Sequence, residues 1–323
     1  MRAIVYHNYG SPDVLELKEV EKPTPQDNEV LVKVHAASVN SWDWDLLRGK
    51  PFLARLVGGG IFKPKYKILG ADIAGRIEAV GRNVKQFQQG EEVFGDISGC
   101  GWGGFAEYVC AHENAVMLKP AKMTFEEAAA VPQAALLALQ GLRDKGQIQP
   151  GQNVLINGAG GGVGTFAVQI AKSFGAEVTG VDSTRKLDMM RSIGADQVID
   201  YMQEDFTQIG QRYDLILDVV ASRSIFAYKR ALSPTGRYVM VGGSMAAIFQ
   251  AVLLGPWISM TGRKKLGLLI YKQNKDLVVM KELFEASKVV PVIDRRYTLS
   301  EVAEALRYFG EGHAKGKVVI TVA

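Results

Sequence analysis

Hydrophobic and polar residues alternate in short segments along positions 1–120 of the chain. Such alternation, with many β-branched residues, is typical of half-buried strands. Proline and glycine separate the segments, as expected of turns between strands. Strands of this kind are predicted at 2–6, 14–20, 29–37, 71–80, 91–97 and 104–110. The chain is therefore expected to begin with a β-rich domain.

The spacing of hydrophobic residues changes near residue 124. Thr124, followed by Glu126 and Glu127, is typical of a helix N-terminus, and an Ala- and Leu-rich helix is expected over 124–145. From residue 153 onward, short apolar strands alternate with helical segments. Strands are predicted at 154–157, 178–181, 198–199, 215–219 and 237–241, and helices at 162–174, 186–193 and 225–232. This alternation predicts an α/β domain, a doubly wound parallel sheet with helices on both faces.

The chain returns to mixed structure after residue 290. A helix is predicted at 300–309 and a final strand at 317–322. The simplest arrangement is a β-rich domain at 1–123 and an α/β domain at 124–290, with a tail that rejoins the first domain.

A glycine-rich segment at 159–164, Ala-Gly-Gly-Gly-Val-Gly, joins a predicted strand to a predicted helix. Aligned with the dinucleotide-binding fingerprint, alanine replaces its first glycine. Gly161 is expected to let the backbone approach a pyrophosphate, and Gly164 to let helix and strand pack closely. The helix N-terminus, with the N–H groups of Gly162 and Val163, is expected to bind phosphate.

The residues after the second strand of this unit bear on the choice of cofactor. Asp182 has the position of the acid that hydrogen-bonds the ribose 2′-OH of NAD. The residues Ser183, Thr184, Arg185 and Lys186 follow at once. Their two hydroxyls and two cations can hold the 2′-phosphate of NADP if Asp182 turns away. Both interpretations stay open, with NADP(H) as the first expectation over NAD(H).

Composition and charge exclude several classes of protein. The chain has 323 residues, 47% hydrophobic and 22% charged, which is ordinary for a two-domain globular protein and excludes a disordered or fibrous one. The net charge of +4 is too weak to indicate a nucleic acid or an anionic membrane as partner. Cys100 and Cys110 alone cannot build a disulfide framework. No targeting segment and no membrane span is recognised, so we expect a cytoplasmic protein.

In all these features the chain resembles the medium-chain dehydrogenase/reductase superfamily, and within it the zinc-independent branch of quinone oxidoreductases and enone reductases. The resemblance covers essentially the whole chain. It is carried by the segments ASVNSWDWDLLRG (37–49), LGADIAGRIEAVG (69–81), GGFAEYV (103–109), AGGGVG (159–164), GADQVIDY (194–201) and GHAKGKVV (312–319).

The resemblance implies a GroES-like β-barrel catalytic domain at 1–123, completed by 291–323, and a Rossmann domain at 124–290. It implies that the nicotinamide is held in a cleft between these domains. It further implies a homodimer that transfers hydride from NAD(P)H to a small hydrophobic quinone or to the C=C bond of an α,β-unsaturated carbonyl.

Catalytic zinc is not expected. The zinc alcohol dehydrogenases of the superfamily use Cys and His ligands, whereas the first ligand position here is Asn40. The other two positions fall within 69–72 and 133–137, which contain neither Cys nor His. Quinones and enones accept hydride without a Lewis acid, because a hydrogen-bond donor or water suffices at the acceptor oxygen.

Several residues are candidate site residues by the same resemblance. Asn40 is expected to position nicotinamide and substrate, Asp43 to hold the loop, and Trp42 to form an apolar wall at the cofactor. Further cofactor contacts are expected at Tyr201, Gly242, Gly243 and Lys317. Leu137 stands where many relatives have a threonine that would contact the nicotinamide side.

Two other functions remain open. A catalytically weak NADPH-binding scaffold or sensor would be compatible with Leu137. An alcohol dehydrogenase-like enzyme would require a metal site. The very apolar segment 245–269 is expected to be a packing segment, a substrate mouth, a dimer interface or a membrane-surface patch.

Overall fold

The computed structural model describes residues 1–56 and 60–322, and it divides into two compact units. Unit 1 comprises Met1–Gln133, Gln273–Lys281 and Ile293–Ala323, and unit 2 comprises Ala134–Lys272 and Glu282–Val292. The first boundary therefore lies ten residues later than the sequence predicts, and a short piece of the expected Rossmann segment belongs to unit 1.

Unit 1 is built on a seven-stranded sheet in the order β14-β15-β3-β4-β5-β7, with β6 paired to β3. A separate antiparallel pair is formed by β1 and β2. The strands are β1 Arg2–Val5, β2 Glu16–Glu19, β3 Glu29–Ser38, β4 Asp72–Val80, β5 Glu92–Asp96, β6 Tyr108–His112, β7 Met117–Leu118, β14 Ile293–Thr298 and β15 Lys317–Thr321. Its helices are α1 Ser41–Arg48, α2 Phe52–Ala54, α3 Phe125–Ala130, α9 Leu277–Glu285 (shared with unit 2) and α10 Val302–Gly310. Strand β15 pairs with β3, so the C-terminal strand lies in the same sheet as the N-terminal ones.

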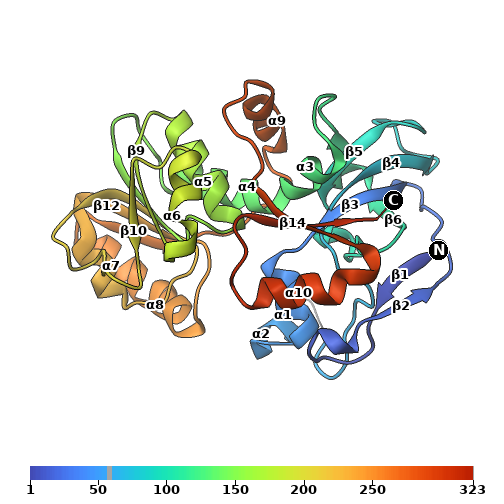
Figure 1. The fold of residues 1–323 in the computed structure, drawn as a ribbon, viewed down its shortest axis with the longest axis horizontal. Coiled ribbons are helices and arrows are strands. Elements are labelled where there is room, and N and C mark those ends of the chain that lie inside the picture. Colours follow the sequence, from blue (N-terminus) through green and yellow to red (C-terminus); the bar gives the residue numbers. More distant parts are fainter. Residues whose placement is uncertain (57–59, 323) are drawn as a thin grey trace. The chain divides into compact units, whose positions relative to one another are not determined.

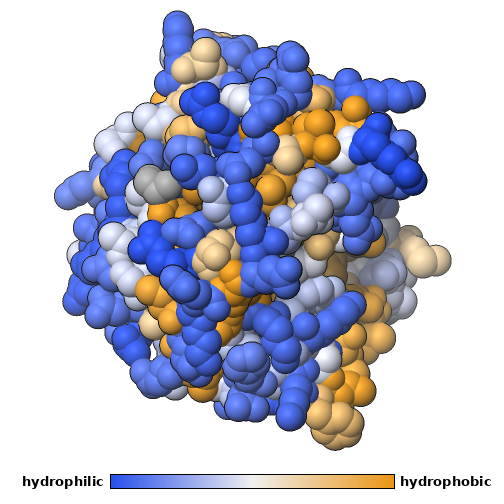
Figure 2. Space-filling model, turned by 90° about the vertical axis from the view of Figure 1, so that its right-hand side faces the viewer, coloured by the Kyte–Doolittle hydropathy of each residue, from blue (hydrophilic) through white to orange (hydrophobic). Residues whose placement is uncertain are grey.

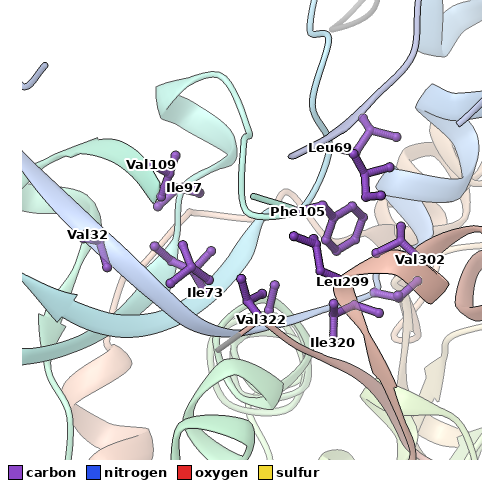
Figure 3. Close-up of a cluster of buried hydrophobic side chains, with 14 of the residues drawn as sticks. Val32, Leu69, Ile73, Ile97, Phe105, Val109, Leu299, Val302, Ile320 and Val322 are labelled. Carbon is purple, nitrogen blue, oxygen red and sulfur yellow. The ribbon is translucent and has the colours of Figure 1, made fainter. Parts of the chain in front are cut away.

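The core of unit 1 joins segments from both ends of the chain (Figure 3). Val32 on β3 and Ile73 on β4 lie in one cluster with Phe105, and Ile320 and Val322 from the C-terminal part join it. Burial of these side chains stabilises the unit through the hydrophobic effect.

Hydrophilic side chains cover most of the face in the space-filling view, with hydrophobic ones in smaller patches between them (Figure 2).

Unit 2 contains a parallel six-stranded sheet in the order β10-β9-β8-β11-β12-β13. Its strands are β8 Asn153–Asn157, β9 Glu177–Asp182, β10 Gln197–Asp200, β11 Tyr213–Asp218, β12 Leu232–Met240 and β13 Lys265–Leu268. Its helices are α4 Pro132–Leu139 (which begins in unit 1), α5 Gly162–Ser173, α6 Leu187–Ser192, α7 Ile225–Ala231 and α8 Met245–Thr261 (Figure 1). The strand order reverses at β8, so right-handed crossovers place α5 and α6 on one face and α7 and α8 on the other. The predicted doubly wound Rossmann sheet is confirmed.

The region 124–145 and the apolar segment 245–269 differ from the sequence prediction. The long helix expected over 124–145 is divided into α3, α4 and a π-helical turn, Gln140–Lys145. The division between α3 and α4 falls at Pro132, which has no N–H to continue the hydrogen-bond ladder of α3. Strand β13 was not predicted because its residues lie in the apolar segment 245–269.

Among the described residues, no helix is both long and apolar enough to cross a membrane.

Candidate active site

A buried cluster of polar side chains lies in unit 1, where β3 passes into α1. Asn40 precedes α1, and Asp43 lies in its first turn, completely buried. One carboxylate oxygen of Asp43 accepts the Asn40 N–H at 2.9 Å, and the other accepts the Gly70 N–H at 2.9 Å. Asp43 thus ties the start of α1 to the turn that precedes β4.

Lys317 and Asp72 form the charged centre of this cluster. Lys317 opens β15 and is buried, with its ammonium nitrogen 3.7 Å from Asp72 Oδ2. That nitrogen also donates to Asn40 Oδ1 at 2.5 Å and to the Val39 carbonyl at 3.1 Å. The Asn40 amide nitrogen donates to Asp72 Oδ2 at 3.0 Å, and the Gln133 N–H donates to the same carboxylate at 3.2 Å. Asn40 therefore links the ammonium to the carboxylate.

Burial shifts the pKa values of Asp43, Asp72 and Lys317. It raises the pKa of Asp43 to about 7, although the two N–H donors oppose the shift. It also raises the pKa of Asp72 and lowers that of Lys317, while the attraction between these two opposes both shifts. Asp96 lies directly opposite Asp72 in the pairing of β5 with β4 and adds a further negative charge. The charged state of each group thus depends on its neighbours.

The raised pKa of Asp43 predicts a stability difference between pH about 4 and about 7. Above pH 3.8 the Asp43 carboxyl is ionised in the unfolded chain but still protonated in the folded one. The free energy of unfolding therefore falls by roughly 4 kcal/mol as the pH rises to about 7. Asp43→Asn removes this titration. Urea unfolding at several pH values should show the wild type losing its advantage over the variant as pH rises. A difference that stays constant with pH would contradict the assignment.

The donor set of this cluster does not fit a zinc ion. Zinc requires three or four nitrogen, sulfur or oxygen ligands close together. The amide oxygen of Asn40 and the carboxylate of Asp72 instead bind the ammonium of Lys317. Within the described parts of the chain, no three His, Cys, Asp or Glu side chains gather into a metal-binding group.

The glycine-rich turn of unit 2 joins β8 to α5. Gly158 has φ of 84° and makes the tight turn directly after the strand, a role that the fingerprint alignment assigned to the next position. A Cβ on Gly164 would lie 2.1 Å from the Gly158 carbonyl oxygen, so the expected close packing at Gly164 is present. A Cβ on Gly161 would meet nothing nearer than 3.5 Å, so this side of the turn is open. Together with the first turn of α5, which begins with Gly162 and Val163, the turn has the form of a pyrophosphate site.

Asp182 at the end of β9 turns back toward the glycine-rich turn. Its Oδ2 accepts the Gly160 N–H at 2.9 Å, and its Oδ1 accepts the Ser183 N–H at 2.8 Å. The ammonium of Lys186 lies 3.4 Å from Oδ1, and both side chains are largely buried. The protein's own groups therefore already bind both carboxylate oxygens.

The remaining cofactor candidates of unit 2 differ in exposure. Arg185, three positions after Asp182 in the chain, is exposed, and within the described residues no ion pair or hydrogen bond of its side chain is found. Tyr201 is half exposed, and its N–H donates to the Asp182 carbonyl at 3.2 Å, which places it at the end of β9. Gly242 and Gly243 follow β12, where Gly243 pairs with Ala221.

The predicted site residues thus fall into two groups. Asn40, Asp43 and Lys317 come together inside unit 1, and Trp42 is partly exposed on the same helix as Asp43. All the other predicted cofactor contacts belong to unit 2, including Leu137, which is partly buried on α4.

The sequence prediction missed a second buried network in unit 2. Asp218 at the end of β11 accepts hydrogen bonds from the amide of Asn157 at 2.8 Å and the hydroxyl of Tyr238 at 2.9 Å. Burial raises the pKa of Asp218. The sequence does contain a signal for this network, because each of two apolar strands ends in a polar residue. These residues lie at the carboxyl edge of the sheet, where cofactors bind.

Comparison with known proteins shows which family this architecture represents. Residues 26–121 match the alcohol dehydrogenase GroES-like domain, and residues 193–320 match the zinc-binding dehydrogenase domain. The chain is 32% identical to the chloroplast envelope quinone oxidoreductase homolog of Arabidopsis thaliana, over 99% of this chain and 98% of that protein. The chain belongs to the quinone oxidoreductase branch of the medium-chain dehydrogenase/reductase superfamily. It is also 34% identical to the 2-methylene-furan-3-one reductase of Solanum lycopersicum, over 99% of this chain and 79% of that protein.

Solved structures of this superfamily share the fold. The quinone oxidoreductase from Coxiella burnetii superposes with a TM-score of 0.89 at 31% identity, covering 100% of this chain and 99% of that one. The CurK enoyl reductase superposes with a TM-score of 0.87 at 26% identity, covering 100% of this chain and 99% of that one. The GroES-like domain and the Rossmann sheet that the resemblance implied are therefore confirmed.

Proposed function

We propose that this chain is an NADPH-dependent reductase of quinones or of the C=C bond of α,β-unsaturated carbonyls. The observation that carries the proposal is the open glycine-rich turn before α5, built as a pyrophosphate site. The names of similar proteins, which include a quinone oxidoreductase and an NADPH-dependent alkenal/one oxidoreductase, support the acceptor class. The unsuitability of the Asn40 cluster for zinc favours acceptors that need no Lewis acid.

In this proposal each group of residues has a separate task. The N–H groups of Gly162 and Val163 bind the pyrophosphate at the start of α5. NADPH supplies the hydride. Asn40 and Asp43 are positioning residues, since Asp43 fixes the backbone of Asn40 and Lys317 fixes its side chain. Trp42, partly exposed beside them, supplies an apolar wall.

The orientation of Asp182 supports NADPH over NADH. Its two oxygens already accept N–H groups of Gly160 and Ser183, so the carboxylate is a poor partner for a ribose 2′-OH. Exposed Arg185 is then the cation available for a 2′-phosphate, as charge-assisted hydrogen bonds to phosphate are strong.

Arg185→Ala is expected to raise the Kd for NADPH about tenfold and to leave the Kd for NADH unchanged, because only NADPH carries the phosphate. Fluorescence titration with both cofactors measures this. Arg191→Ala, which removes another exposed cation from the neighbouring helix α6, serves as the control. Equal effects of Arg185→Ala on both cofactors would contradict the assignment.

Turnover tests the reaction itself. Purified protein with NADPH is expected to oxidise the cofactor when quinones or small enones are added, as followed by its near-ultraviolet absorbance. Tight NADPH binding without turnover on any acceptor would instead support a scaffold or sensor. Stoichiometric zinc in the protein, with alcohol oxidation, would support an alcohol dehydrogenase.

A homodimer and a cytoplasmic location are part of the same proposal. The sequence resemblance supports the dimer, and light scattering of the purified protein tests it. Names of several relatives include chloroplastic or mitochondrial, so location is tested by fractionation of cells that express the full chain.

A further inference from the structure

Unit 1 exposes a group of apolar side chains on and after helix α2. The most exposed of them is Phe62, at 91%. Phe52 on α2 follows at 58%. We call the group the Phe62 patch, and it consists of Phe52, Leu53, Leu56, Ile61 and Phe62. Exposed apolar side chains that gather on a soluble protein mark an interaction site.

Hydrogen bonds bring the two parts of the Phe62 patch together across residues 57–59, which the structure does not describe. The Gly60 N–H donates to the Arg55 carbonyl at 2.8 Å, and the Tyr9 hydroxyl donates to the Gly60 carbonyl. The Arg55 guanidinium lies over the Tyr9 ring at 4.4 Å. The residue that follows each partner of the bond between Gly60 and Arg55 belongs to the patch. Its two parts therefore lie close together at the surface of unit 1.

The charged residues of this segment are all cations. The sequence over 46–71 contains six Lys and Arg residues and neither Asp nor Glu. Four of its lysines are exposed, and within the described residues none of them is paired with a carboxylate: Lys50, Lys63, Lys65 and Lys67. The acids at either end of the segment are Asp45, whose pKa burial raises to about 6, and the buried Asp72. The segment thus carries positive charge beside an apolar group.

We propose that the Phe62 patch docks on an anionic phospholipid membrane. The apolar side chains enter the interface between headgroups and acyl chains, and the exposed lysines of 50–67 lie at the lipid phosphates. Lysine suits this position, because its aliphatic stem lies along apolar groups while its ammonium reaches the headgroups.

The charge pattern favours a membrane over other occupants of the patch. A membrane presents anionic headgroups directly above an apolar phase, which matches lysines beside a protruding phenylalanine. A second copy of this chain is less suitable, since a symmetric interface through the patch would bring two sets of unpaired lysines together. An acidic protein partner is the alternative that the experiments below distinguish.

Docking through this patch would bring the enzyme to the phase in which hydrophobic acceptors dissolve. That consequence rests on the proposed function, whereas docking itself does not. Vesicle binding therefore tests the patch even if the protein reduces no quinone, and turnover on water-soluble enones tests the function without a membrane.

The first experiment is co-sedimentation of the full chain with vesicles. Vesicles of phosphatidylcholine with about a quarter phosphatidylglycerol are expected to bind the protein at least about tenfold more tightly than phosphatidylcholine alone, and added salt should weaken binding. Lys63→Glu with Lys65→Glu should weaken binding about a hundredfold. The matched control reverses two exposed lysines elsewhere, Lys122→Glu with Lys288→Glu, and should change binding by less than about threefold.

The second experiment tests the apolar part of the patch. Phe62→Ser should weaken binding to anionic vesicles at least about tenfold. Leu118→Ser, at an exposed apolar position of β7, is the control and should not. Phe62→Trp should add fluorescence that brominated lipids quench, whereas the fluorescence added by Leu118→Trp should stay unquenched. Since Phe62 is 91% exposed, its replacement removes little packing from the fold.

Four results would overturn the proposal. The first is equal binding to anionic and neutral vesicles, and the second is a charge reversal at Lys63 and Lys65 that acts no more strongly than its control. The third is a Phe62→Ser variant that loses only self-association in light scattering, which would assign the patch to a second copy of the chain. The fourth is binding of polyglutamate without binding of vesicles, which would assign it to an acidic protein.

Discussion

Replacing Lys317 with methionine is expected to lower the free energy of unfolding by about 3–5 kcal/mol. The buried ammonium is the cation beside Asp72, and its removal leaves that carboxylate without a countercharge inside unit 1. It also frees the amide oxygen of Asn40, which accepts from the ammonium. Urea unfolding at neutral pH measures the loss.

Two further variants separate charge from packing in this experiment. Lys317→Met combined with Asp72→Asn should recover a large part of the lost stability, because the double variant contains no uncompensated charge. Lys172→Met removes a cation whose ion pair with Asp196 is partly exposed, and it should cost less than about 1 kcal/mol. If Lys317→Met lowered the free energy of unfolding no more than Lys172→Met does, the buried pair of Lys317 and Asp72 would be unimportant for stability.

Replacing Gly164 with alanine is expected to cost about 2–3 kcal/mol of stability and at least about a hundredfold in NADPH affinity. The added Cβ would lie 2.1 Å from the Gly158 carbonyl oxygen and 2.6 Å from the backbone of Ala159. Since both are main-chain atoms, the turn between β8 and α5 has to move. Thermal unfolding and cofactor titration measure the two effects.

Gly161→Ala is the matched control for this substitution. Its Cβ would have 3.5 Å of clearance, so the fold should be retained. The same Cβ would nevertheless reach into the space proposed for the pyrophosphate, and NADPH should bind weakly. Full NADPH binding by the Gly161 variant would contradict the proposed phosphate site.

Local patterns were sufficient to predict much of unit 2. The helix predicted at 162–174 is α5, Gly162–Ser173, because glycine before an amphipathic run is a strong local signal. The helix expected over 124–145 was wrong as a single element, since Pro132 divides it. Strand β13 depends on pairing with β12, and no short-range pattern reports such a pairing.

The sequence was sufficient to predict individual residues of the site but not the hydrogen bonds and ion pairs that join them. Asn40, Asp43 and Lys317 were all candidates, but their assembly depends on the pairing of β15 with β3. Asp96 gave no signal, because its position opposite Asp72 is a property of strand register. Likewise, the motif placed Asp182 at the end of β9, whereas its orientation comes from the hydrogen bond with Gly160.

The discontinuity of unit 1 has a consequence for biosynthesis. Asp72 and Asn40 are made early, but Lys317, which neutralises Asp72 and donates to Asn40, arrives with β15 after all of unit 2 has been translated. A domain made first normally folds first on the ribosome. Unit 2 is therefore expected to fold before unit 1, which still lacks β15. A nascent chain stalled before Lys317 should be cleaved by protease in the segments of unit 1 and not in those of unit 2.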